Sequence, residues 1–290
     1  MRDLKLGFAD TFDTAKRFFT ETLSQYYNVI RDDDAPDYLI FGDRNFGETH
    51  YRYTECKKIF YTGENIWPNY FTYDHAISFD HENSPKHYRL PLYVLEMKMM
   101  TYEGWTDDYL YLVNRKIDVE QEYANKKRFC TFVQSNPTCE MRNNFFKFLD
   151  SRKRVDSAGP HLNNTGFILP RTGMHHKLNF AREGKFNIAF ENGSRRGYAT
   201  EKILNAFYSN TIPIYWGSDS IGREFNTKAF INCHDYQTFD QVIDRVFEID
   251  NNKNLYCEML SEPVFKKNIP NEYTNLHSFY KWFDTFVYEG

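Results

Sequence analysis

A strand, a turn with two glycines and a helix follow one another in the second half of the chain, and this order can bind an anion. The strand is Phe186–Phe190, the turn Glu191–Gly197 and the helix Thr200–Ser209. The first N–H groups of a helix lack partners within it, so they can hold a phosphate group. Lys202 adds a positive charge in the first turn, and the carboxylate of Glu201 can accept hydrogen bonds from sugar hydroxyls. These residue types predict an anion site and nothing more specific.

A second strand, Ile212–Trp216, ends in Gly217-Ser218, a small turn that would let the backbone approach a ligand. The alternative interpretation is structural. Thr200 can be a plain N-cap in any α/β protein, and the adjacent Arg195 and Arg196 would ordinarily form a solvated turn. That interpretation accounts for each short piece, but not for the whole string from the first strand to the second.

Two other groups of residues could bind a metal, and neither has the expected context. Asp32-Asp33-Asp34 lies between early strands and just before Ala35-Pro36, which favours a solvated loop. The adjacent His175-His176 pair has a spacing unsuited to chelation from one helical face. We therefore expect no metal site and no metal cofactor.

The elements of the first third predict a parallel α/β sheet. Short apolar runs are expected as strands at Lys5–Ala9, Asn28–Arg31, Tyr38–Phe41, Lys58–Thr62 and His75–Phe79. A helical pattern occupies Asp13–Tyr26, and a strand–helix–strand order is typical of parallel sheets. Because ligands bind at the carboxyl ends of such strands, Gly63-Glu64-Asn65 is a candidate site.

A largely polar stretch, Glu103–Lys127, has the composition of a connection between domains, and a second α/β pattern follows it. The expected elements of that pattern are strands at 128–134, 185–190, 212–216 and 229–233 and helices at 142–152, 200–209 and 239–251. His277–Val287 has an apolar face that needs a partner. We predict an α/β protein with domains at 1–120 and 121–265, and a C-terminal helix in 266–290 that packs on the first domain.

Length, charge and cysteine content limit the class of protein. A chain of 290 residues is too long for one core and fits two domains of roughly 130–150 residues. With 36 Lys and Arg against 40 Asp and Glu, there is no basic surplus for nucleic acid. Five widely spaced cysteines without a CxxC pair are expected to be reduced thiols in the cytoplasm. No apolar run approaches a membrane span, while peripheral association with the inner face of a membrane stays open.

The string FENGSRRGYATEKILNAF, followed by IPIYWGS, resembles the signature of the bacterial-type α-1,3-fucosyltransferases, glycosyltransferase family 10. YTGEN at Tyr61–Asn65, RLPLY at Arg89–Tyr93 and FVQSNP with Arg142-Asn143 agree with the same family in order. The similarity covers roughly residues 58 to 250. The string FENGSRRGYATEKILNAF with IPIYWGS is highly specific to the family. TGEN is a shorter match, but it occurs in the expected order.

The resemblance implies a GT-B fold, with two Rossmann-like domains facing across a cleft. It also implies inverting transfer of L-fucose from GDP-fucose to a GlcNAc-containing glycan such as N-acetyllactosamine, giving a Lewis-x type product without an essential metal. The partners would be GDP-fucose and an oligosaccharide acceptor. Two alternatives stay open: a GT-B enzyme that uses another nucleotide sugar, and a catalytically idle relative that binds glycans.

The resemblance also assigns roles to donor residues. Arg142 and Lys202 would contact the pyrophosphate of GDP-fucose. Tyr198 and Glu201 would lie against the ribose or the fucose, and Asn192 would line the nucleotide pocket. Two fixed cations of this kind would stabilise the negative charge that grows on GDP as it departs.

The same resemblance makes Glu64 the general base. Inversion at the anomeric carbon requires that the acceptor hydroxyl lose its proton as it attacks, and a carboxylate is chemically adequate for that step. Without the resemblance, Glu64 would be an ordinary acidic residue in a glycine-containing turn.

Overall fold

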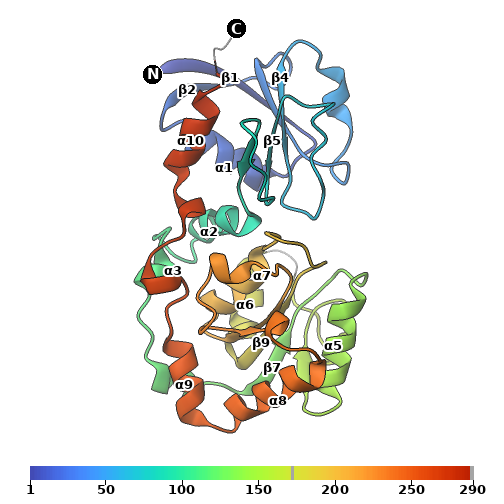
Figure 1. Ribbon diagram of the computed structural model, residues 1–290, viewed down its shortest axis with the longest axis vertical. Coiled ribbons are helices and arrows are strands. Elements are labelled where there is room, and N and C mark those ends of the chain that lie inside the picture. Colours follow the sequence, from blue (N-terminus) through green and yellow to red (C-terminus); the bar gives the residue numbers. More distant parts are fainter. Residues whose placement is uncertain (171–172, 288–290) are drawn as a thin grey trace. The chain divides into compact units, whose positions relative to one another are not determined.

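The computed structural model describes residues 1–170 and 173–287, and the chain forms two compact units (Figure 1). Unit 1 comprises Met1–Met99 and the segment that begins at Glu272, and unit 2 comprises Met100–Asn271. Each unit contains one parallel sheet with helices packed against it. The predicted α/β class is therefore confirmed.

The sheet of unit 1 has six strands in the order β2-β1-β3-β4-β5-β6, and every neighbouring pair is parallel. Their bounds are β1 Arg2–Ala9, β2 Tyr27–Arg31, β3 Tyr38–Phe41, β4 Lys57–Tyr61, β5 His75–Ser78 and β6 His87–Arg89. Phe41 of β3 pairs with Phe60 of β4, so these strands end side by side at the carboxyl edge. The loops after β3 and β4 therefore start from neighbouring positions.

Two helices cover one face of this sheet. Helix α1 (Asp13–Leu23) buries the apolar stripe that its sequence predicts, including Phe19. The ring of Phe279 in α10 (Leu276–Asp284) lies 5.7 Å from that of Phe19, and the hydroxyl of Tyr27 donates to Asp284 at 2.5 Å. The C-terminal helix thus packs within unit 1, next to α1 and β2.

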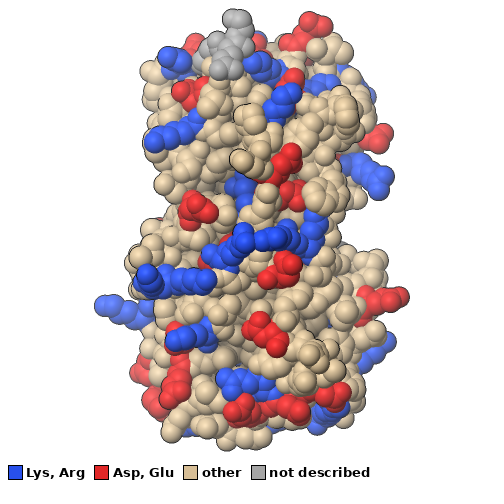
Figure 2. Space-filling model, viewed as in Figure 1, with Lys and Arg blue, Asp and Glu red and all other residues tan. Residues whose placement is uncertain are grey.

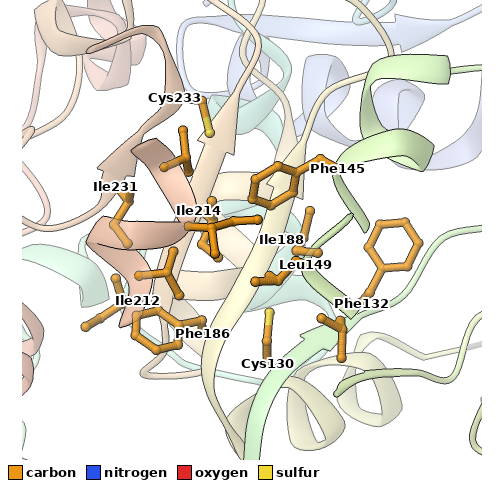
Figure 3. Packing of buried hydrophobic residues seen from close by; sticks show 14 of the residues in the cluster. Cys130, Phe132, Phe145, Leu149, Phe186, Ile188, Ile212, Ile214, Ile231 and Cys233 are labelled. Carbon is orange, nitrogen blue, oxygen red and sulfur yellow. The ribbon is translucent and has the colours of Figure 1, made fainter. Parts of the chain in front are cut away.

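The sheet of unit 2 has five parallel strands in the order β11-β10-β9-β7-β8. The strands are β7 Arg128–Phe132, β8 Val155–Ser157, β9 Gly184–Phe190, β10 Ile212–Trp216 and β11 Ile231–Asn232. The helices include α2 Leu92–Tyr102 at the unit boundary, α5 Glu140–Asp150, α6 Met174–Arg182, α7 Glu201–Tyr208, α8 Phe239–Asp250 and α9 Lys253–Ser261. Ile188, Ile214, Phe145 and Leu149 lie in one buried cluster between the strands and α5 (Figure 3). Helices α6 and α7 contact each other and β9.

The polar stretch 103–127 is not a connection between domains. It contains α3 (Tyr111–Asn114) and α4 (Val119–Ala124) and lies wholly in unit 2. Arg115 donates to the carbonyl of Phe207 at 2.8 Å, and Lys126 donates to that of Asn210 at 2.6 Å. These cations satisfy carbonyl groups at the end of α7. The units therefore divide after residues 99 and 271, whereas 120 and 265 were expected.

Candidate active site

A buried carboxylate joins the end of β9 to the start of α7. Glu191 follows β9 directly and is fully buried. It accepts hydrogen bonds from the backbone N–H of Thr200 at 2.8 Å and from its hydroxyl at 2.6 Å. The ammonium of Lys202 lies 3.2 Å from Glu191 Oε2, the oxygen that also accepts the hydroxyl of Thr200. Burial of a charged carboxylate is costly unless it is paired and hydrogen-bonded, and these contacts hold the first turn of α7 to the end of β9.

Thr200 occupies the N-cap position of α7, as predicted, but its side chain forms no capping hydrogen bond to the helix. Its hydroxyl donates to Glu191 instead. The first N–H groups of α7 are therefore not capped by that side chain. This is the condition under which a helix start can accept an anion.

Lys202 is surrounded by oxygen atoms. Its ammonium donates to Thr200 Oγ1 at 2.9 Å and lies 3.2 Å from both Glu191 and Glu201. Burial lowers the pKa of Lys202, but the two carboxylates outweigh this effect, so its pKa lies above the ordinary value. Burial raises the pKa of Glu191, and the neighbouring Glu201 raises it further against the opposing effect of Lys202. Lys202 is thus firmly charged, and a phosphate group would have to compete with Glu201 for one of its N–H groups.

Arg142 is a second buried cation, and its partners are neutral. Its side chain extends from the first turn of α5 and is fully buried. The guanidinium donates to Asn192 Oδ1 at 2.9 Å and to the carbonyls of Asn136 and Phe190 at 2.8 and 3.3 Å. Across residues 1–170 and 173–287 it forms no ion pair with a carboxylate, and its Nε has no hydrogen-bond partner. The positive charge of Arg142 is therefore available to attract an anion. Direct contact between the guanidinium and an anion would require the segment that carries Asn192 to move.

The turn after Glu191 is fastened to the end of β10. Gly197 adopts a φ of +84° and donates its N–H to Ser218 Oγ at 2.8 Å. Ser194 donates to the carbonyl of Gly217 at 2.7 Å. The ring of Tyr198 is fully buried, and its carbonyl accepts from the hydroxyl of Tyr215. The turn that carries the candidate donor residues is consequently held at both of its sides.

Gly217, at the end of β10, packs closely against two buried side chains. A Cβ atom there would lie 2.4 Å from Cγ of Glu191 and 2.7 Å from the hydroxyl of Tyr215. The space beside Gly217 is therefore filled by protein. This glycine makes room for the buried side chain of Glu191.

Glu64 lies in unit 1, and all five candidate donor residues lie in unit 2. It follows β4 by three residues, in the turn that contains Gly63. Its N–H donates to Thr62 Oγ1 at 3.0 Å, and its carbonyl accepts from Ile66 at 2.7 Å. Burial raises the pKa of Tyr61, and the charges of Glu96 and Glu64 raise it further. The carboxylate of Glu64 therefore lies at the carboxyl edge of the sheet, as predicted, near a phenol that stays neutral.

Sequence reasoning gave no role to Glu191. This residue lies at the centre of the unit 2 cluster, which consists of Glu191, Thr200, Glu201 and Lys202. A signal was present, because an acidic residue directly after a buried strand of a parallel sheet lies at the ligand-binding edge.

The acidic run Asp32–Asp34 forms ion pairs with nearby cations. Asp32 lies 3.2 Å from Lys5, and Asp33 lies 2.6 Å from Arg31. Within the described part of the chain, no group of three His, Cys, Asp or Glu residues could hold a metal ion.

Charged side chains of both signs lie on the surface of the protein. Figure 2 shows Lys and Arg side chains interspersed with Asp and Glu on the face in view, over a chain of net charge −4. Among the residues that the structure describes, no helix has the length and apolar character needed to cross a bilayer.

Two family models together match most of the chain. The α-(1,3)-fucosyltransferase FucT N-terminal domain matches residues 5–96, and the C-terminal model of glycosyltransferase family 10 (fucosyltransferase) matches residues 96–262. The junction at residue 96 falls close to the boundary between the two units.

Individual relatives agree with these models. The α-(1,3)-fucosyltransferase FucT of Helicobacter pylori is 34% identical over 265 residues, which are 83% of this chain and 54% of that protein. The chain thus spans about half the length of this relative. Human 4-galactosyl-N-acetylglucosaminide 3-α-L-fucosyltransferase 9 is 30% identical over 89 residues, 30% of this chain and 25% of that one.

A solved structure extends the similarity to the fold. The crystal structure of an α1,3-fucosyltransferase with GDP-fucose superimposes with a TM-score of 0.78 and 29% identity, covering 100% of this chain and 92% of that one. The match to the C-terminal family model alone includes more than half of the residues, among them the strand, turn and helix around Glu191. The chain belongs to glycosyltransferase family 10, the fucosyltransferase family.

Proposed function

We propose that this protein transfers L-fucose from GDP-fucose to the 3-hydroxyl of GlcNAc in a glycan such as N-acetyllactosamine, with inversion at the anomeric carbon. The observation that carries the proposal is the pair of buried cations at the carboxyl end of β9. Lys202 lies at the start of α7, and Arg142 lies in the first turn of α5, where no carboxylate of the described residues pairs with it. In a family whose solved structures include one with GDP-fucose, this pair suits a nucleoside diphosphate.

The reaction divides into two demands on the protein. Glu64 takes the proton of the acceptor hydroxyl as that oxygen attacks C1 of fucose. The bond between C1 and the β-phosphate oxygen breaks at the same time, and its electron pair leaves with GDP. Arg142 and Lys202 stabilise the negative charge that develops there, and protein contacts hold both cations near the carboxyl end of β9 before the donor binds.

The remaining donor residues have positioning roles in this proposal. Asn192 holds the guanidinium of Arg142 through its amide oxygen and presents its NH₂ group to the nucleotide. Glu201 exchanges its contact with Lys202 for the hydroxyls of the sugar, which frees one N–H of the ammonium for phosphate. Tyr198, whose ring is buried, supports the turn on which the ribose or fucose rests.

The proposal includes a reducing location and no metal cofactor. All five cysteines are free thiols, which suits the cytoplasm. The two cations supply the charge that a divalent ion gives in other transferases, so we expect EDTA to leave turnover unchanged.

The direct test incubates the protein with GDP-fucose and N-acetyllactosamine and measures the fucosylated product by mass spectrometry and the released GDP. We expect the wild type to form the fucosylated product. We expect this product to be lost in Glu64→Gln and in Lys202→Met. Product with UDP- or GDP-linked sugars other than GDP-fucose, but none with GDP-fucose, would contradict the donor assignment. Absence of any turnover together with intact glycan binding would indicate an idle relative.

A further inference from the structure

A pocket of about 360 Å³ in unit 1 has the composition of a sugar-binding site. It opens between the loops that follow β3 and β4, where the half-buried Tyr73 packs on the buried Phe41 and Phe60. The ring of Tyr73 lies 5.0 Å from that of Phe41 and 4.9 Å from that of Phe60. Its volume is at the small end of the roughly 300–1,000 Å³ of ligand pockets, which suits a short saccharide.

The rim of the pocket has polar side chains that the protein itself does not use. Arg44, Glu48 and Tyr51 are exposed. In the described ranges, the side chains of Arg44 and Glu48 form no hydrogen bond or ion pair. The exposed fraction of Tyr51 is 63%, although one face of its ring lies against His50. A guanidinium and a carboxylate at one rim can hydrogen-bond neighbouring hydroxyls as donor and acceptor.

The interior of the pocket is rigid. The imidazole of His50 stacks on Phe41, with ring centroids 4.2 Å apart, and its Nδ1 lies 2.7 Å from the carboxylate of Asp10. Asp43 is 5% exposed and accepts from the N–H of Asn45 at 2.9 Å. Fixed side chains of this kind lose little entropy when a ligand binds.

The pocket adjoins the candidate base. The hydroxyl of Thr62 lies 3.4 Å from Asp43 Oδ2, and it accepts the N–H of Glu64 at 3.0 Å. Ile66, which donates its N–H to the carbonyl of Glu64, lines the pocket directly. A sugar seated in the pocket therefore lies beside the turn that carries Glu64, within the same unit.

We infer that this pocket holds one pyranose ring of the acceptor glycan, so that the adjoining sugar presents its hydroxyl to Glu64. The inference rests on the proposed function. A pyranose has an apolar C–H face for the ring of Tyr73 or Tyr51 and hydroxyls at its edge for Arg44 and Glu48. A phosphorylated donor is disfavoured here, because the pocket contains two carboxylates, Asp43 and Glu48, against one guanidinium.

Two rim variants test the pocket without disturbing the core, Arg44→Ala and Tyr51→Ala. Phe71→Ala is the matched control, because Phe71 is a fully exposed aromatic residue of unit 1 that does not line the pocket. Binding of N-acetyllactosamine is measured by saturation-transfer NMR titration, and binding of GDP by calorimetry. We expect each rim variant to weaken binding of the disaccharide about tenfold, with GDP affinity unchanged and the control like the wild type.

Unchanged disaccharide binding in both rim variants, or none in the wild type, would overturn the inference. Steady-state kinetics separates it from the proposed function. If the wild type makes fucosylated product and both rim variants keep the wild-type KM for N-acetyllactosamine, the pocket assignment fails and the function stands. If the disaccharide binds with the expected dependence on Arg44 and Tyr51 but no product forms, the function fails and the pocket stands.

Discussion

The cluster around Glu191 and the turn around Glu64 differ in how deeply each carboxylate is buried. Glu191 is fully buried and bound through its side chain to Thr200 and Lys202, at 2.6–3.2 Å. Glu64 is only partly buried, and its backbone forms hydrogen bonds with Thr62 and Ile66. Both follow a strand of a parallel sheet, so sequence position alone does not distinguish them.

The difference teaches what each site can do. A network whose charges are already paired is preorganised, and it suits a ligand whose charge is fixed, such as a diphosphate. A partly buried carboxylate at the carboxyl edge of a sheet suits proton transfer with a bound substrate. We therefore assign charge stabilisation to unit 2 and proton transfer to unit 1, and the following predictions test this division.

Replacing the base should have the largest effect. Glu64→Gln keeps the shape of the side chain and removes its basicity, so kcat should fall by about 10²–10⁴. Binding of GDP should not change. Glu55→Gln, at an exposed position of the same unit, is the control. Wild-type turnover in Glu64→Gln would show that Glu64 is not the general base.

Removing the ammonium of the unit 2 cluster should cost stability as well as binding. Lys202→Met leaves Glu191 and Glu201 without their cation, which we expect to lower the free energy of unfolding by about 3–5 kcal/mol. The double variant Lys202→Met/Glu191→Gln should recover much of this loss while GDP binding stays impaired. Chemical denaturation and calorimetry measure the two quantities. Recovery of GDP binding in the double variant would mean that Lys202 is purely structural.

The packing beside Glu191 gives a smaller effect. Gly217→Ala places a methyl group 2.4 Å from Cγ of Glu191, so it should destabilise the protein by about 1–3 kcal/mol. Gly222→Ala is the control, since its nearest neighbour is the methyl group of Thr227 at 3.0 Å. Equal unfolding midpoints for the two variants would show that the cluster around Glu191 is looser than described.

The smallest effect concerns acid stability in unit 1. Burial alone would raise the pKa of Asp10, but hydrogen bonds from His50 and Thr49 outweigh it, so the pKa lies below the ordinary 3.8. A carboxylate with a lowered pKa stabilises the fold above the ordinary value, and this contribution is lost as the pH falls through the lowered pKa.

Asp10→Asn should therefore cost about 1 kcal/mol at pH 7 and flatten the decline of stability below about pH 4. Asparagine tolerates the φ of +48° at this position, so the backbone is not strained. The measurement is the free energy of unfolding as a function of pH. A decline identical to that of the wild type would contradict the role of Asp10.

Local patterns predicted the elements well, because apolar periodicity is set within a few residues. The predicted bounds of Tyr38–Phe41 and Ile212–Trp216 agree with β3 and β10, and the other predicted strands differ by a few residues at their ends. The string around Glu191 also predicted the family, which the family models confirm.

What could not be predicted depends on contacts between distant residues. The role of Glu191 requires Thr200 and Lys202 to fold back onto it, and the buried position of Arg142 depends on Asn192, fifty residues away. The stretch 103–127 resembled a linker because it is rich in charged residues. The sequence does not show that Arg115 and Lys126 donate to carbonyl groups at the end of α7. The roles of Glu64 and of the five donor residues stay predictions.

The division of labour is tested most directly by measuring GDP-fucose affinity and the single-turnover rate in the same two variants. We expect Glu64→Gln to bind GDP-fucose like the wild type and to transfer fucose at least about a hundredfold more slowly. We expect Lys202→Met/Glu191→Gln to remain folded and to lose affinity for GDP-fucose. Loss of GDP-fucose affinity in Glu64→Gln, or undiminished affinity in the double variant, would contradict the assignment of the donor to unit 2 and of the proton transfer to unit 1.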